Sequence, residues 1–75
     1  MVRAKFRCVS VRVGEGEHAQ AEIRLEPVTS GSDENKSFFK YTPSGRVELG
    51  VVNPAAAAQF QEGREYYVDF TPAAE

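Results

Sequence analysis

The sequence predicts a mainly β fold: a small five-stranded SH3-like barrel, or alternatively an OB-like barrel, with one short helix before the last strand. Three observations lead to this prediction. Apolar and polar residues alternate over several short segments, as in half-buried strands. A segment rich in alanine, with residues that start helices, precedes the last alternating segment. The 75 residues suffice for one small domain, residues 1–75.

The first strand is expected at residues 2–13, where apolar side chains alternate with Arg3, Lys5 and Arg7. The apolar phase slips by one residue between Cys8 and Val9, which indicates a β-bulge. Residues 14–17 (GEGE) predict a turn. The second strand, residues 19–26, is the clearest alternation in the chain, with Pro27 at its end.

The middle of the chain is less regular. Residues 29–37 are polar and predict either a loop or a single helical turn that starts at Ser30 or Ser32. Residues 37–42 predict a short aromatic strand, and residues 42–45 (TPSG) a type I turn. Alternation over residues 46–51 then gives the second arm of this hairpin.

The helix is predicted to begin with Asn53 as N-cap and Pro54 at its first position, and to end at Gly63 with a positive φ. Alternation over residues 65–70 predicts the last strand, which Pro72 ends. A short helix before the final strand is the arrangement of an SH3-like barrel, whereas an OB-fold places its helix after the third strand. An open sheet with one helix is the third alternative.

The apolar phase of each segment predicts one shared core. Its expected members are Phe6, Val11, Ile23, Leu25, Val47, Leu49, Phe60, Val68 and Phe70.

Two stretches resemble a known group of proteins. Residues 34–45 (ENKSFFKYTPSG), together with Phe60, Gly63 and the tail EYYVDFT, are similar to small proteins of unassigned function from tailed-bacteriophage and prophage genomes. The segments KFRC at residues 5–8 and LEPV at residues 25–28 fit the same pattern. The resemblance implies a phage origin and the bacterial cytoplasm as the working compartment, and it supplies no catalytic or binding residues.

Composition argues against several classes of function. The net charge of −2 gives no overall attraction to nucleic acid or to anionic membranes. Because Cys8 is the only cysteine, an internal disulfide or a structural zinc site is not expected, and its strand position predicts a small buried side chain. The sequence shows no signal-peptide pattern and no apolar run of membrane-span length, so we expect a cytoplasmic protein.

Enzymatic motifs are also missing from the sequence. It holds no phosphate-binding glycine loop, HExxH or CxxC motif, and His18 lies in an expected turn. We therefore expect no enzyme, no catalytic residues, no metal site and no cofactor.

Two surfaces are candidates for binding. Phe38, Phe39 and Tyr41 are interleaved with basic residues. In a strand, Phe39 and Tyr41 would share one face and Phe38 the other, so some aromatic side chains should face outward, as should Tyr67 on the last strand. Exposed aromatic and cationic side chains suit protein interfaces. The predicted protein-binding residues are Phe38, Tyr67, Lys40 and Arg46.

The alternative surface would bind single-stranded nucleic acid. Side chains at alternate strand positions project to one side about 6.5–7 Å apart, close to the spacing of phosphates on an extended strand. The residues for this role are Arg3, Lys5, Arg7 and Lys36. The structural alternative is that the first-strand cations pair with acidic residues such as Asp69 on neighbouring strands.

The sequence thus favours a non-enzymatic, phage-type binding module that contacts a protein, either a second copy or a bacterial host factor. Single-stranded nucleic-acid binding is the alternative. A small-ligand or nucleotide sponge, formed at an oligomer interface, is the second alternative.

Overall fold

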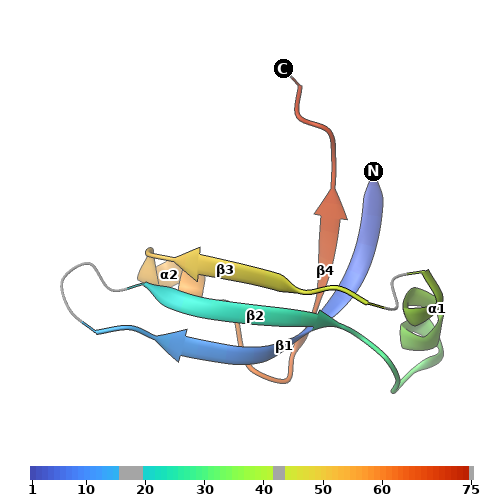
Figure 1. Cartoon of the computed structure of the whole chain (residues 1–75), viewed down its shortest axis with the longest axis horizontal. Coiled ribbons are helices and arrows are strands. Elements are labelled where there is room, and N and C mark those ends of the chain that lie inside the picture. Colours follow the sequence, from blue (N-terminus) through green and yellow to red (C-terminus); the bar gives the residue numbers. More distant parts are fainter. Residues whose placement is uncertain (16–19, 42–43, 75) are drawn as a thin grey trace.

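The computed structural model describes residues 1–15, 20–41 and 44–74. In chain order its elements are β1 (Val2–Val13), β2 (Ala21–Pro27), α1 (Asp33–Tyr41), β3 (Val47–Val51), α2 (Pro54–Ala57) and β4 (Glu65–Phe70). All strand pairs are antiparallel, and the strand order is β3-β2-β1-β4 (Figure 1). The mainly β fold with a short helix before the last strand is confirmed.

The expected third strand at residues 37–42 is wrong, because residues 33–41 form the helix α1. Ser32 starts this helix, since its Oγ accepts a hydrogen bond from the Asn35 backbone N at 3.1 Å. Asp33 and Glu34 suit the positive end of the helix. The predicted single turn therefore continues through the aromatic segment, whose β propensity is overridden by contacts with the sheet.

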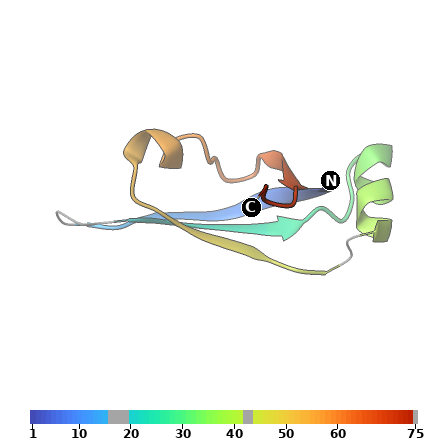
Figure 2. The ribbon, with the colours of Figure 1, turned by 90° about the horizontal axis from the view of Figure 1, so that it is seen from above.

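Over the described residues the sheet has four strands rather than five, and it is a half-barrel whose free edges are β3 and β4. The small barrel-like β fold is confirmed, whereas the prediction of five strands with an SH3-like or OB-like topology is wrong, because the segment expected to add the fifth strand is helical. The molecule measures 42 × 36 × 18 Å, and Figure 2 shows how thin the sheet is from its side. Its radius of gyration of 13.9 Å exceeds the value of about 11 Å typical of a compact chain of this length.

The bulge in β1 is confirmed. Cys8 pairs with Leu25 and Ser10 with Arg24, which leaves Val9 without a partner on β2. The Cys8 backbone also bonds to the segment before β4, since its N donates to Arg64 O at 2.9 Å and its O accepts from Gly63 N at 2.8 Å. The bulge moves the even-numbered side chains of β1 from the apolar face to the polar face.

The core is built on the apolar face of β1 and β2. Phe6, Ile23 and Leu25 are buried as predicted. Further predicted members pack against this cluster while partly buried: Val11, Val47, Phe60 and Val68. Leu49 and Phe70 contradict the prediction, with exposed fractions of 40% and 55%. Both residues lie on edge strands, where no further strand covers them.

The helix α2 begins as predicted. Asn53 Oδ1 accepts hydrogen bonds from the backbone N of Ala55 at 2.8 Å and of Ala56 at 3.2 Å. The helix ends earlier than expected, with Ala58 as its C-cap. Gly63 has the predicted positive φ of +89°, but it lies in the turn that leads to β4. The predicted turns at residues 14–17 and 42–45 lie partly, and His18 and Ala19 wholly, outside the described residues.

Candidate functional site

Helix α1 lies at the opposite end of the sheet from α2 (Figure 1) and is held there by a buried asparagine. Asn35 is 2% exposed. Its Nδ2 donates to Ser30 O at 3.0 Å and to Glu65 Oε2 on β4 at 2.7 Å. These bonds fix one face of α1 against the polar side of the sheet.

An aromatic pair completes the contact between α1 and the sheet. The rings of Phe38 and Tyr67 have their centroids 6.0 Å apart. The Tyr67 hydroxyl donates to Glu34 on α1, and the Arg3 guanidinium lies 4.9 Å from the centre of the Tyr67 ring. The structure thus brings together two of the predicted protein-binding residues, Phe38 and Tyr67. Phe38 is half-buried because it packs inward, whereas Tyr67 remains 51% exposed.

The basic row of β1 consists of Arg3, Lys5 and Arg7. These side chains project to one side of the sheet, as predicted, but each of them forms an ion pair with an acidic residue. Arg3 forms two hydrogen bonds to Asp69, at 2.6 and 3.0 Å. Arg7 Nη2 lies 2.7 Å from Glu65 Oε2. Lys5 Nζ, whose side chain is 11% exposed, lies between Glu34 at 3.2 Å and Glu65 at 3.4 Å. Three cations therefore face three carboxylates, which supports the structural alternative for this row.

The same contacts set the protonation of these acidic groups. Hydrogen bonds from the Tyr67 hydroxyl and from Lys5 lower the pKa of Glu34 below its usual value. Hydrogen bonds from Arg7 and the Asn35 amide lower the pKa of Glu65. A hydrogen bond from Arg3 lowers the pKa of Asp69 in the same way. Because all three pKa values are lowered, Glu34, Glu65 and Asp69 are ionised at neutral pH. They therefore neutralise the basic row under physiological conditions.

The remaining predicted residues are more dispersed. Lys36 and Lys40 are exposed on α1 and form no ion pair within the described part of the chain. Arg46 Nε lies 3.0 Å from Glu48 Oε1 on β3, so this guanidinium is directed to the β3 edge of the sheet. Arg46 therefore forms its ion pair at the β3 edge and does not share a surface with Phe38 and Tyr67, contrary to the prediction.

The sequence prediction placed Phe39 and Tyr41 together on one face of a strand and did not count them among the protein-binding residues. On the helix, Phe39 is 39% exposed and Tyr41 is 79% exposed. Helical spacing places Lys36, Phe39 and Lys40 on neighbouring positions of one face. Reading the segment with a period of 3.6 residues from the Ser32 cap would have found this. We call the exposed side chains Lys36, Phe39, Lys40 and Tyr41 the α1 surface.

No group of three or more His, Cys, Asp and Glu residues is arranged to hold a metal ion among the residues that the structure describes. Cys8 is fully buried, and its burial raises the pKa of the thiol. A buried thiol with a raised pKa is a poor nucleophile. The helices α1 and α2 have nine and four residues, so neither helix in the described ranges is long and apolar enough to cross a membrane.

Comparison with curated proteins finds a similarity to a subunit of the glutamyl-tRNA(Gln) amidotransferase of Aeropyrum pernix, at 32% identity over 71 residues. The match covers 88% of this chain but 11% of that protein. No family model and no solved structure matches the chain. The resemblance to phage proteins stays a prediction.

Proposed function

We propose that this chain is a non-catalytic binding module that acts through protein–protein contacts, with a second copy or a bacterial protein as its partner. The observation that carries the proposal is the α1 surface. Phe39 and Tyr41 project from a helix that is already fixed to the sheet through Asn35 and Phe38, so they are free to contact another molecule. Exposed aromatic side chains on a rigid element are typical of interface hot spots.

The rest of the exposed surface supports this proposal. Of the five phenylalanines and three tyrosines in the sequence, at least four side chains are exposed: Phe39, Tyr41, Tyr67 and Phe70. Aromatic residues are enriched in protein interfaces relative to other surfaces. The similar protein from Aeropyrum pernix is named as a subunit, which fits a segment that contributes to an assembly.

The test compares a double variant of the α1 surface with a variant of another exposed apolar side chain. Phe39→Ala with Tyr41→Ala should weaken self-association or partner capture by ~2 kcal/mol or more, which is about thirtyfold in the dissociation constant. Val13→Ala is the control, because Val13 is 79% exposed, like Tyr41, but lies at the far end of β1. Sedimentation at increasing protein concentration and capture from nuclease-treated bacterial lysate provide the two measurements. A parent that stays monomeric and captures no protein would refute the proposal.

Nucleic-acid binding is the second candidate, because two observations favour it. Lys36 and Lys40 flank Phe39 on the α1 surface, and the similar protein is named for a glutamyl-tRNA amidotransferase. Each phosphate contact on a single strand contributes a slope of about 0.7 to the logarithmic salt dependence of binding. Replacing both lysines with glutamine should then reduce the slope by about 1.4, while replacing the neutralised Arg3, Lys5 and Arg7 should leave it nearly unchanged.

A further inference from the structure

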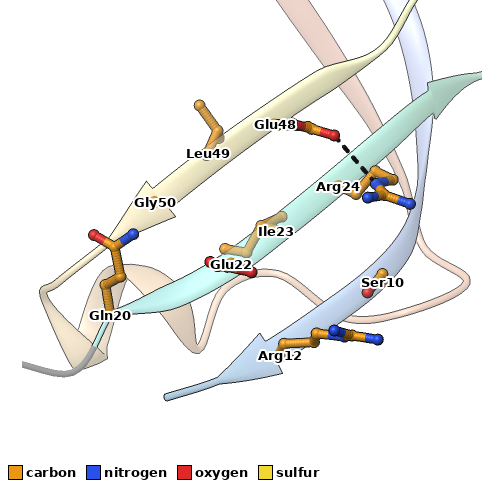
Figure 3. A pocket seen from close by; sticks show the side chains of 9 residues that line it. All are labelled: Ser10, Arg12, Gln20, Glu22, Ile23, Arg24, Glu48, Leu49 and Gly50. Atoms are coloured by element: carbon orange, nitrogen blue, oxygen red, sulfur yellow. Dashed lines mark ion pairs between the residues drawn. The ribbon is translucent and has the colours of Figure 1, made fainter. Parts of the chain in front are cut away.

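The polar face of the sheet has a groove of about 350 Å³ across β1, β2 and β3, at the end opposite α1 (Figure 3). The residues that matter for its chemistry are Ser10, Arg12, Gln20, Glu22, Arg24 and Glu48. Figure 3 shows the Ser10 side chain between the guanidinium groups of Arg12 and Arg24. The groove is separate from the α1 surface, so its role does not depend on the proposed function.

The bulge in β1 creates this arrangement. Before the bulge, the even-numbered side chains of β1 face the core, as Phe6 and Cys8 do. After it, Ser10 lies opposite Arg24, and Arg12 lies two residues further along β1 on the same polar face. Cross-strand partners hold their Cβ atoms about 4.5–5.5 Å apart, so the hydroxyl and both guanidinium groups can reach one ligand. Bulges that redirect side chains are common next to functional sites.

The ion pairs in this part of the sheet leave guanidinium donors available in the groove. Arg24 and Arg46 share a single carboxylate, since their Nε atoms lie 3.4 and 3.0 Å from Glu48 Oε1. Arg12 forms no ion pair within the described residues, although Glu22 lies directly opposite on β2. The groove lining therefore holds two arginines and two glutamates, and its guanidinium donors are available because Arg12 has no ion-pair partner among the described residues and Arg24 shares Glu48 with Arg46.

Gly50 limits the groove on the β3 side. A Cβ at Gly50 would lie 2.8 Å from Gln20 Nε2, so the absence of a side chain there lets the Gln20 amide lie against the strand. This amide closes one end of the groove with a hydrogen-bonding group. A side chain at position 50 would displace it.

We propose that Arg12, Arg24 and Ser10 bind the phosphate group of a small phosphate ester of about nucleotide size. Two guanidinium forks and a hydroxyl supply the donors that phosphate oxygens accept. A volume of about 350 Å³ lies at the small end of the range for ligand sites, roughly 300–1,000 Å³. A polynucleotide would need a continuous track of phosphate contacts, and the neighbouring cations Arg3, Lys5 and Arg7 are already paired with carboxylates.

The test is an NMR titration of the ¹⁵N-labelled chain with adenosine monophosphate, inorganic phosphate and an eight-nucleotide single strand at equal ionic strength. Adenosine monophosphate should cause saturable shifts in the amides of Ser10, Arg12, Arg24 and Gly50. Arg12→Gln and Arg24→Gln should each weaken binding about tenfold or more, because each removes a charge-assisted contact. Arg3→Gln is the matched control on the same face, and it should bind as the parent does.

Glu48→Gln separates the proposal from a structural role of these residues. Because Glu48 competes with the ligand for Arg24, its neutralisation should strengthen phosphate binding by a few fold. Ser10→Ala should also weaken the binding of adenosine monophosphate. This variant replaces an arginine variant in the test if that variant fails to fold. Three results would overturn the proposal: shifts that sodium chloride reproduces, an Arg12→Gln variant that binds like the parent, or binding of the oligonucleotide alone.

Discussion

The Nδ2 of Asn35 on α1 lies 2.7 Å from Glu65 Oε2 on β4, and this bond joins two residues that are 30 positions apart in the chain. The same carboxylate also accepts from Arg7. A buried amide thus connects the helix to the edge strand at the point where β4 begins. This connection makes α1 part of the folded structure rather than a loop.

Removing the Asn35 side chain should release α1 without unfolding the sheet. In Asn35→Ala we expect the α1 amides to exchange with solvent roughly tenfold faster, because the two hydrogen bonds of the Asn35 amide are lost. Amides of β1 and β2 should keep their parent rates. Hydrogen exchange followed by NMR measures both. Asn35→Asp is the sharper variant, since it places a second carboxylate beside Glu65, and equal exchange rates in all three proteins would contradict the role of Asn35.

Acid should destabilise the fold through the carboxylates that hold α1 and β4. The folded-state pKa values of Glu34, Glu65 and Asp69 are lowered. The stability they contribute is therefore complete above the unfolded pKa values, about 3.9 for Asp and 4.3 for Glu, and is lost as the pH falls through the lower folded values. Urea unfolding between pH 7 and pH 2 should show a decline that begins near pH 5. Glu65→Gln should have a shallower decline, and a parallel one would count against the network.

Core packing predicts different costs at two positions that face each other. Ile23 is 1% exposed, and Ile23→Ala should lower the free energy of unfolding by ~2–5 kcal/mol. Leu49, its partner on β3, is 40% exposed, so Leu49→Ala should cost clearly less. Thermal and urea denaturation of both variants gives the comparison. Equal losses would mean that Leu49 is covered in solution, as it would be if another chain packed on that edge.

The N-cap of α2 should contribute measurably because the helix has four residues. Asn53→Ala removes the acceptor for Ala55 N and Ala56 N, and we expect a loss of roughly 0.5–2 kcal/mol. Asn53→Asp keeps an acceptor oxygen and should retain most of the stability. Urea unfolding midpoints of the two variants measure this difference. If both variants unfolded at the same midpoint as the parent, the cap would have no energetic role.

Structural features that depend on residues close together in the sequence could be predicted from it. The bulge between Cys8 and Ser10 follows from a phase slip, and the Asn53 cap follows from a side chain that bonds two and three residues ahead. The strand assignment of residues 37–42 failed because Asn35 and Phe38 are fixed by Glu65 and Tyr67, which lie far away in the sequence. The neutralisation of the basic row likewise depends on ion pairs with residues of α1 and β4, which lie far away in the sequence. The local pattern of aromatic and basic residues does not indicate these pairs.

The thinness of the sheet has a calorimetric consequence. A compact domain of 75 residues unfolds with a heat-capacity increment of about 1 kcal/mol per kelvin, which reflects the apolar surface that becomes hydrated. With a thickness of 18 Å and an open edge on each side, the isolated chain covers less of that surface. Its increment should therefore be smaller and its curve of stability against temperature flatter. Association through any of its exposed apolar side chains would restore the missing heat capacity and make the increment depend on protein concentration.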